Sequence, residues 1–384
     1  MKITIERKLL LTALSIVKSA AMDERTQGSP PVLFNVQINT FDKSVEFICT
    51  NLDIALRARV GAEIKSKGST TVRATLLHDL VRGFADEQVE LHLVKDVLHV
   101  IFGDSKYRLA TLPADEFPPV PRLRDAYEVE VPQSSLRSLL ASTLFAVDTD
   151  HSTTALNGSL LRLNGNVTVV GCDGKRLAMT SADAEGLGKK TKELIVPRAS
   201  ISQLVRLLDD DEESNSKCRI VAADNLVQFH LGDAVLTSKL IEGNYVKFDE
   251  IIPSKSKGGI PIGRVEMLAA VQRCALISST CRIDARKQSL NIHAIGEGGQ
   301  GEASENLLIP PSGNLRATFD ARHLIDALNA IDDDEVQFFA PPNEPVVLKV
   351  AGKPWLSVIV SHREKSEPAK APEPPKAEEQ TTAE

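Results

Sequence analysis

Three groups of residues in this sequence have types and spacings that could support chemistry. Acidic runs follow apolar segments at Asp86–Glu87, Asp209–Glu213 and Asp332–Glu335, and adjacent carboxylates can hold magnesium for phosphoryl transfer. The segment GEGGQG, from Gly296 to Gly301, has the G-x-G-x-x-G spacing of a dinucleotide-binding turn. Five cysteines and eight histidines complete the candidate nucleophiles and metal ligands.

Each group also has a plainer interpretation, which the sequence favours. The acidic runs recur at the same point of three similar stretches, as solvated turns between a helix and a strand would. The segment EASENLLIPP follows GEGGQG and ends in two prolines. It is therefore not the long helix, with an acidic residue further downstream, that follows a dinucleotide-binding turn. A hairpin turn is therefore predicted there. His92 and His99 stand in alternating, strand-like sequence, where a solvent-facing side chain is expected.

The cysteines point to a reducing compartment. They are odd in number, scattered, and contain no C-x-x-C pair; they are Cys49, Cys172, Cys218, Cys274 and Cys281. Nothing assembles a nucleophile, a base and an orienting group, so we expect no catalytic residues, no metal site and no cofactor. A metal-dependent nucleic-acid enzyme using Asp209–Asp211 stays open as a minor alternative.

Composition limits the class of protein. The chain has 384 residues, 42% hydrophobic and 25% charged, which predicts two to four domains with their own cores. No apolar run approaches a membrane span, and no secretory signal opens the sequence, so a soluble cytoplasmic protein with no membrane partner is expected. The net charge of −7 argues against a surface that is basic all over, but allows one basic face. The last twenty residues hold four prolines and no large aliphatic side chain, which predicts a disordered tail.

An internal repeat organises the rest of the chain. Stretches starting at Thr70, Glu193 and Leu315 share a strand, an amphipathic helix, an acidic turn and alternating strands. Their apolar residues recur at helical spacing: Leu76, Leu77, Leu80 and Val81; Ile201, Leu204, Val205 and Leu208; Leu324, Ala327, Leu328 and Ile331. Helices with the same setting are predicted upstream, within 1–20, 127–147 and 262–279.

The repeat predicts an α+β fold with three similar domains, each built from two helix-plus-strands units. The expected bounds are 1–122, 126–253 and 260–364, followed by the tail at 365–384. Six related units in one chain suggest a symmetric assembly.

Basic residues recur on these helices although the protein is acidic. A shared positive surface that meets phosphates without reading sequence is one hypothesis, because no base-reading motif accompanies it; solvated helix faces are the alternative. The residues are Lys8, Lys18, Arg82, Arg137, Arg198, Arg206 and Arg273.

Several short motifs, in one order, resemble a known family. MKITIER, NLDIALRARV and YRLATLPADEFP in the first domain, with ALNG, CDGKRLA and LTSKLIEGNY in the second, are similar to the bacterial DNA sliding clamp, the beta subunit of DNA polymerase III. The resemblance covers residues 1 to 363. It implies a DNA-clamp fold that closes head to tail as a homodimer around double-stranded DNA. It further implies a processivity role without catalysis, near the nucleoid, with DNA polymerase III core, clamp loader and other proteins bearing a clamp-binding motif as partners.

The resemblance also implies three sets of site residues. A pocket for an apolar partner peptide would comprise Leu156, Cys172, Gly174, Lys175, Arg176, Leu177, Val246, Ile251, Val358 and Val360. The dimer interface would pair Leu80, Phe84, Tyr107 and Leu109 with Leu276 and Ile277 of the other copy. DNA contacts would come from Arg25, Arg73, Arg82, Arg137, Arg198, Arg206 and Arg273.

The chain departs from the family pattern at several points. The loop RTQGSPPVLFN is long, Thr154 and Ala155 stand where the family has two tyrosines, and Cys172 replaces a threonine. These changes leave a second hypothesis open, in which a clamp-fold paralogue is a protein-interaction scaffold without a core replication role.

Overall fold

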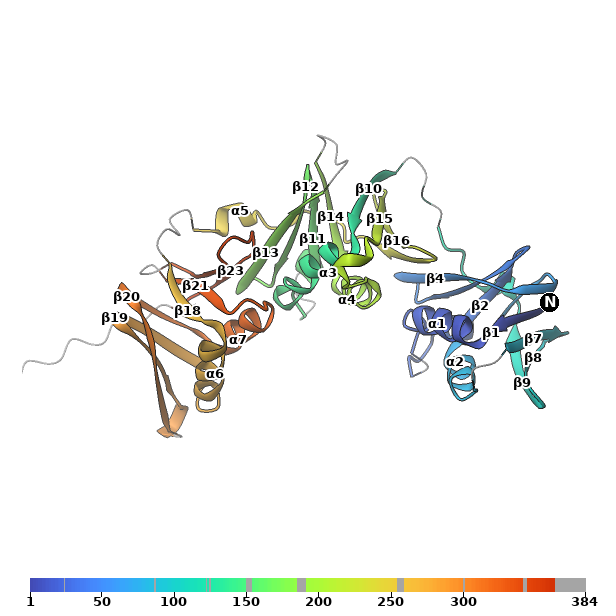
Figure 1. Cartoon of the computed structure of the whole chain (residues 1–384), viewed down its shortest axis with the longest axis horizontal. Helices are drawn as coiled ribbons and strands as arrows, with labels where there is room; N and C mark the ends of the chain where they lie inside the picture. Colours follow the sequence, from blue (N-terminus) through green and yellow to red (C-terminus); the bar gives the residue numbers. More distant parts are fainter. Residues whose placement is uncertain are drawn as a thin grey trace, which may run out of the picture.

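The computed structural model describes residues 1–23, 25–85, 88–121, 123, 126–149, 154–184, 191–253, 259–299, 301–340 and 344–362. These residues form an arc, with the paired helices on its concave side and the sheets on its convex side (Figure 1). The predicted tail at 365–384 and the acidic pair Asp86–Glu87 lie outside the described residues.

The first third of the chain contains two helices and most of one large sheet. Its elements are β1 (Lys2–Glu6), α1 (Arg7–Lys18), β2 (Asn35–Thr40), β3 (Ser44–Thr50), β4 (Ile54–Gly61), β5 (Glu63–Ser66), β6 (Ser69–Arg73), α2 (Ala74–Arg82), β7 (Gln88–Val94), β8 (Val97–Phe102) and β9 (Ser105–Leu112). Short 3₁₀ turns lie at η1 (Pro31–Phe34) and η2 (Ala114–Glu116).

The middle third repeats this plan. Its elements are β10 (Tyr127–Pro132), α3 (Gln133–Ala141), η3 (Leu144–Ala146), η4 (Thr154–Asn157), β11 (Gly158–Leu163), β12 (Asn166–Cys172), β13 (Arg176–Asp183), β14 (Lys192–Pro197), α4 (Arg198–Leu207), η5 (Glu212–Ser214), β15 (Lys217–Ala222), β16 (Leu226–Leu231), β17 (Ala234–Lys239) and α5 (Phe248–Ile251).

The last third completes the arc. Its elements are β18 (Ile260–Gly263), α6 (Arg264–Ala275), β19 (Thr280–Ile295), η6 (Glu297–Gly299), β20 (Glu302–Asp320), α7 (Ala321–Asn329), β21 (Glu335–Phe339), β22 (Val346–Lys349) and β23 (Leu356–Ile359). No helix in the described parts of the chain is long and apolar enough to cross a membrane.

The helices form where the apolar spacing predicted them. In α7, Leu324, Ala327 and Leu328 are buried, and α4 buries Ile201 and Leu204. The predicted face of α2 is wrong at one position, because Leu76 is 47% exposed. The buried stripe of α2 consists of Ala74, Leu77 and Val81, whose i, i+3, i+7 spacing leaves Leu76 beside the stripe.

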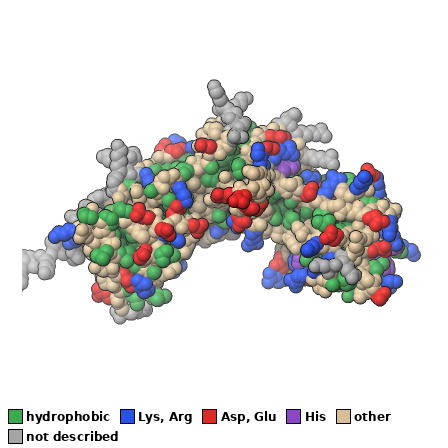
Figure 2. All heavy atoms as spheres, viewed as in Figure 1, with side chains coloured by type: hydrophobic (Ala, Val, Ile, Leu, Met, Phe, Trp, Pro, Cys, Tyr) green, Lys and Arg blue, Asp and Glu red, His purple; other side chains and the backbone are tan. Residues whose placement is uncertain are grey.

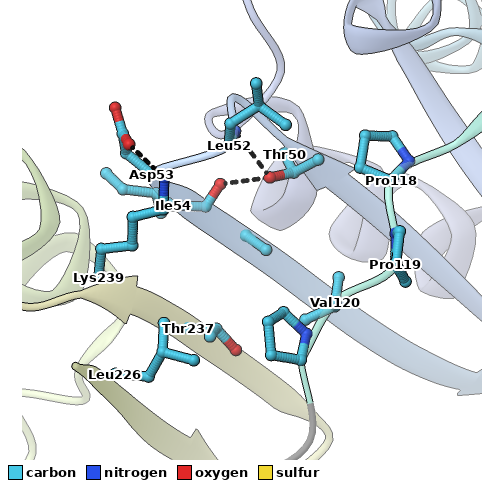
Figure 3. Close-up of a pocket in the computed structure, with 12 residues that line it drawn as sticks. Thr50, Leu52, Asp53, Ile54, Pro118, Pro119, Val120, Leu226, Thr237 and Lys239 are labelled. Carbon is cyan, nitrogen blue, oxygen red and sulfur yellow. Dashed lines mark hydrogen bonds and ion pairs between the residues drawn. The ribbon is translucent and has the colours of Figure 1, made fainter. Parts of the chain in front are cut away.

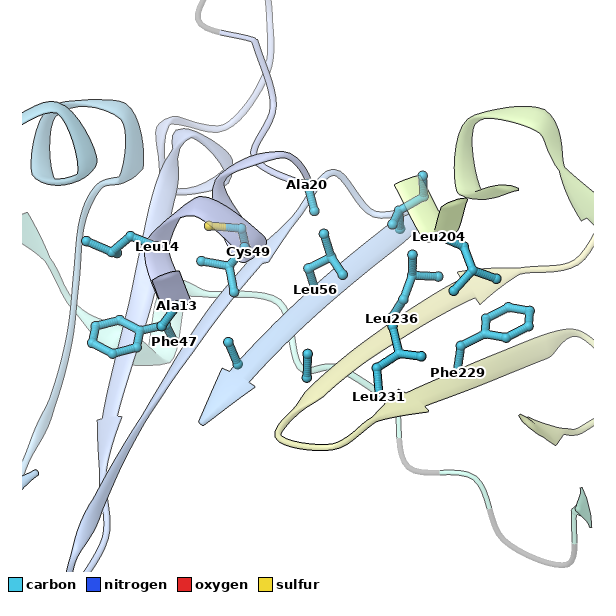
Figure 4. Packing of buried hydrophobic residues seen from close by; sticks show 14 of the residues in the cluster. Ala13, Leu14, Ala20, Phe47, Cys49, Leu56, Leu204, Phe229, Leu231 and Leu236 are labelled. Atoms are coloured by element: carbon cyan, nitrogen blue, oxygen red, sulfur yellow. The ribbon is translucent and has the colours of Figure 1, made fainter. Parts of the chain in front are cut away.

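Two strand pairs join the thirds of the chain into continuous sheets. At the first junction, β4 pairs antiparallel with β17 inside a 13-stranded sheet. At the second junction, β13 pairs with β23 inside an 8-stranded sheet. β19 and β20 form a separate hairpin. A buried core runs across the first junction, from Leu14 and Phe47 through Leu56 to Leu236 and Phe229 (Figure 4).

The motifs that could have supported chemistry occupy turns. GEGGQG connects β19 to β20, where the Gly296 N–H donates to the Gly301 carbonyl at 2.9 Å, so the predicted hairpin turn is confirmed. The run Asp209–Glu213 lies between α4 and β15, and Asp332–Glu335 lies between α7 and β21. Across the described ranges, no group of three or more His, Cys, Asp or Glu side chains is arranged to hold a metal ion.

Candidate functional site

Exposed arginines on the concave side are the first candidate for function. Arg82 ends α2 with a side chain that is 68% exposed, 4.0 Å from the Asp79 carboxylate. Arg206 is exposed on α4 and lines a groove of about 530 Å³ against α1, together with Thr12, Ser15 and Gln203. Guanidinium, hydroxyl and amide groups on one face are the donors that proteins commonly offer to phosphates.

Other predicted DNA contacts are engaged within the protein. Arg198 donates to the carbonyls of Leu144 and Val147 at 2.7 and 2.8 Å, and burial together with nearby Arg176 lowers its pKa. Arg273 makes a two-point ion pair with Glu305 at 2.7 and 2.8 Å. The contacts of Arg198 argue against the direct DNA role that the sequence suggested, because its guanidinium already caps η3.

A recurrent contact explains why an arginine lies on the first helix of each domain. Arg7 donates to the Val81 and Arg82 carbonyls, Arg137 to the Val205 carbonyl, and Arg264 to the Leu328 carbonyl. Each places a positive charge at the C-terminal end of the second helix, where carbonyls lack helical partners and the helix dipole is negative. Arg137, predicted as a DNA contact, is thus also a helix cap and lies 3.2 Å from Asp210.

Charges near α1 and α2 are also paired. Arg25, in the loop after α1, is 90% exposed and bonds Asp23, and this partner lowers the pKa of Asp23 to about 2. Lys18 lies 3.3 Å from Asp79, while Arg73 is exposed at the start of α2. Acidic and basic side chains are interspersed over the face in Figure 2, with an acidic group at its centre. The surface is therefore not basic all over, in agreement with the net charge of −7.

A second candidate site lies at the second junction, where an apolar cluster joins two domains. Of the predicted peptide-pocket residues, the structure buries four in this cluster, namely Leu156, Cys172, Leu177 and Val358. Leu177 and Val358 are direct partners across β13 and β23, and Val246 packs against them. Ile251 and Val360 are 39% and 45% exposed, so they offer apolar surface to solvent. Burial raises the pKa of the Cys172 thiol, which opposes nucleophilic use.

A tight turn holds the polar members of this set. The Asp173 carboxylate accepts from the N–H groups of Lys175 and Arg176, both at 2.8 Å, and Gly174 adopts a φ of +84°. Arg176 bonds Asp173 and reaches Asp326 on α7 at 2.5 Å. Arg176 therefore links the two domains beside the cluster, while Lys175 is exposed.

Sequence reasoning missed several members of this cluster. Phe248 is 1% exposed and carries Arg162 over its ring at 4.5 Å, while Phe339 and Val347 close the cluster from the last domain. Tyr245 donates to the Val170 carbonyl at 3.3 Å. Phe248 lies in the four-residue helix α5, which is too short to show helical periodicity, so no local pattern could have found it.

The two ends of the arc are the third candidate site. At the first end, the Phe84 ring stacks on Phe102 at 4.4 Å and tilts against Tyr107 at 5.6 Å. Leu80 packs nearby and Leu109 is 8% exposed. β9 pairs with β8 from Ser105 to Ala110, but meets β6 only at Thr111 and Leu112. Most of one edge of β9 is therefore open within the described residues.

The other end presents apolar side chains and a second open edge. Leu276 is 84% exposed directly after α6, and its neighbour Ile277 is half-buried. Of the described strands, β20 has only β19 as a sheet partner. Glu302 and Glu305 of β20 are opposite in charge to Lys106 and Arg108 of β9. An exposed apolar side chain beside an unpaired strand edge is a surface that favours pairing with another chain.

Family models described as the N-terminal, central and C-terminal domains of the DNA polymerase III beta subunit match residues 1–121, 130–247 and 249–360. The beta sliding clamp of Pseudomonas aeruginosa is 32% identical over 346 residues, which is 88% of this chain and 92% of that protein. The Escherichia coli K12 beta sliding clamp is 28% identical over 345 residues, with the same coverage.

Solved structures agree with the sequence matches. The crystal structure of the Pseudomonas aeruginosa DNA polymerase III subunit beta has a TM-score of 0.89 and 29% identity, covering 95% of this chain and all of that one. The Bacillus subtilis DNA polymerase sliding clamp, at 22% identity and the same coverage, shows the same fold with a TM-score of 0.88. Three domains with outer sheets and inner helices define the sliding-clamp class of fold. This chain belongs to the DNA polymerase III beta subunit family, the beta sliding clamps.

Proposed function

We propose that two copies of this chain close head to tail into a ring around duplex DNA, as a non-catalytic clamp that tethers a polymerase in the bacterial cytoplasm. The observation that carries the proposal is the arc itself, with helices along its concave side and an open strand edge at each end. Pairing β9 of one copy with β20 of the other would extend the sheets across the interface. Edge strands carry unpaired backbone N–H and C=O groups, and closure of the ring would pair these groups on both strands at once.

The same closure would bring complementary groups together. Leu276 and Ile277 of one copy would pack on the aromatic group formed by Phe84, Phe102 and Tyr107 of the other. Glu302 and Glu305 would meet Lys106 and Arg108. Apolar anchors within a rim of opposite charges favour a specific pairing over an unspecific one.

DNA contact on this proposal falls mainly to the exposed concave arginines. Arg82 and Arg206 would face the central opening of the ring, and the exposed Arg25 and Arg73 would add contacts from the loop after α1 and the start of α2. Arg198 and Arg273 would act by holding the helices in place. Many weak phosphate contacts without base reading allow sliding, because no position along the DNA is preferred.

Partner proteins would dock at the second junction. An apolar peptide from a polymerase or a clamp loader would lie on the exposed Ile251 and Val360, above the buried Leu177 and Val358. A mostly preformed apolar surface suits such a peptide, because little ordering is required on binding. The scaffold hypothesis differs in one respect: it predicts peptide binding without retention on DNA.

Retention on closed DNA is the deciding experiment. Labelled protein is loaded by a clamp loader and ATP onto a nicked circular plasmid, and half of the sample is then cut once with a restriction enzyme. A topological clamp stays on the circle and leaves the linear DNA within its sliding time. Equal retention on circular and linear DNA would contradict encirclement, and absence from both would favour the scaffold.

A further inference from the structure

The first junction has the same backbone hydrogen bonds as the second junction in one turn and one strand contact. Asn51 Oδ1 accepts from the N–H groups of Asp53 and Ile54 at 3.1 and 2.8 Å, as Asp173 does from Lys175 and Arg176. The Lys239 N–H donates to the Asp53 carbonyl at 3.0 Å, and the Val360 N–H donates to the Lys175 carbonyl at 2.9 Å. The two junctions thus share the same turn and the same strand contact.

The side chains at matching positions differ in size. At the second junction Leu177 faces Val358, while the corresponding pair at the first junction is Ala55 and Thr237. A smaller pair in the same frame leaves space unfilled, and a cavity of about 120 Å³ is found at this place. Figure 3 shows it between the Leu52–Ile54 turn, Thr237 and Leu226 of the sheet, and the linker from Pro118 to Val120.

The chemistry of the cavity wall is apolar. Thr50 Oγ1 donates to the Ile54 carbonyl at 2.9 Å and accepts from the Leu52 N–H at 3.0 Å. Thr237 Oγ1 accepts from the Gln228 side chain at 3.3 Å. Because both hydroxyls already have partners, the remaining wall offers apolar contacts, from Leu52, Val120 and Leu226. The space accommodates one aliphatic side chain, and not a whole peptide.

The rim carries an unusual residue. Leu52 has a φ of +78° where the second junction has Gly174 at +84°. A bulky side chain in the left-handed region is strained, and such strain tends to persist at binding sites. The Leu52 side chain is also 50% exposed. Beside it, Asp53 and Lys239 form an exposed ion pair at 3.1 Å, so an acceptor and a donor flank the cavity.

We propose that this first-junction cavity is a second docking site, which takes one aliphatic side chain of an extended peptide. An extended peptide fits because its backbone offers an N–H to Asp53 and a carbonyl to Lys239 while the anchor enters the cavity. The inference rests on the proposed function only for the class of occupant, an apolar peptide. With one anchor, this site binds more weakly than the second junction.

Methyl NMR on the full-length protein tests both sites in one titration. Leucine, isoleucine, valine and threonine methyls are labelled, and the probe is N-acetyl-Gly-Leu-Gly-amide, with N-acetyl-Gly-Gly-Gly-amide as the control peptide. We expect saturable shifts at Leu52, Val120 and Leu226, and roughly tenfold weaker binding of the control, because the buried leucine side chain is lost.

Two variants separate the cavity from general surface binding. Ala55→Leu places at the first junction the side chain found at Leu177, so it fills the cavity and lowers affinity there at least tenfold. Leu52→Gly fits the left-handed φ, keeps the fold and weakens binding by removing the rim. Val94→Ala changes an exposed side chain on β7 that does not line the cavity, so it should keep the affinity and is the control.

The readout distinguishes the possible failures. Shifts confined to Leu177 and Val358 would overturn the second site while supporting the second-junction pocket. Shifts confined to the first junction would support the site proposed there and contradict the second-junction pocket. Absence of any first-junction shift, or shifts that survive in both Ala55→Leu and Leu52→Gly, would overturn the inference.

Discussion

Leu276 is the sharpest test of ring closure, because it is 84% exposed in the single chain. Replacing an exposed side chain leaves the fold of one copy intact, whereas the same change at an interface removes a buried anchor. Burying a leucine contributes about 2 kcal/mol, and a closed head-to-tail ring contains two such interfaces. Leu276→Ala should therefore weaken dimerisation by about 4 kcal/mol, which is close to a 1,000-fold rise in Kd.

Sedimentation equilibrium over a concentration series measures this Kd directly. Val265→Ala is the matched control, since Val265 is 57% exposed near the opposite end of α6 and its loss should leave Kd unchanged. Thermal unfolding of both variants at a concentration where the chain is monomeric should match the parent. A Leu276→Ala protein whose Kd stays within tenfold of the parent would refute the interface, because the apolar anchor would then be irrelevant to closure.

Three further predictions follow from individual contacts. Arg206→Gln should lower DNA affinity and reduce the slope of log affinity against log salt by about one per protomer, whereas an unchanged slope in a salt series would exclude a phosphate contact. The Asp23 carboxylate has a pKa of about 2 because it is hydrogen-bonded to Arg25. It therefore stays charged below its ordinary pKa, and the pairing is lost only as the pH falls from about 3.8 towards 2. Arg25→Ala should raise the NMR titration midpoint of Asp23, and an unchanged midpoint would contradict the pairing. Trp355 donates to the Ser142 carbonyl at 3.1 Å, so Trp355→Phe should lower unfolding stability by about 1 kcal/mol or more, measured by urea denaturation; equal midpoints would show that this bond between domains contributes nothing.

The helices and the repeat could be predicted because their signal is local. Apolar residues spaced by three and four positions must face a core wherever a helix forms. In α4 and α7 this spacing was sufficient to predict both the helix and its buried face. At α2 the pattern contained more apolar residues than the buried stripe needs, so Leu76 was assigned to the wrong face. Local spacing shows which stripes are possible, while packing partners decide which one is buried.

The pairing of strands between domains carries no local signal. Ala55 and Thr237 face each other across the first junction although they are far apart in sequence. The predicted set at the second junction depended on family resemblance for the same reason, and it lacked Phe248 and Phe339, which the chain's own patterns do not mark. Contacts of this kind are set by the tertiary fold.

The role of an arginine on a helix could not be predicted from the sequence for a different reason. A basic residue on an amphipathic helix can face DNA, cap a neighbouring helix or pair with an acid, and sequence spacing is the same in all three cases. Arg206 is exposed, Arg137 reaches the end of α4, and Arg273 pairs with Glu305. Only the position of the carbonyls and carboxylates around each guanidinium separates these uses.

The two junctions show how one repeated frame can acquire different roles through few side chains. At the first junction a continuous apolar core crosses between the domains, so a small buried residue such as Ala55 can line a cavity there without destabilising the junction. At the second junction the outer apolar cluster itself joins the domains, helped by Arg176 with Asp326 and by Trp355 with Ser142. A peptide seated at the second junction would therefore contact the cluster that joins two domains, whereas one at the first junction would contact the Asp53–Lys239 pair and a cavity outside the core that joins the domains. Binding at the second junction should consequently stiffen the angle between its domains more than binding at the first junction does.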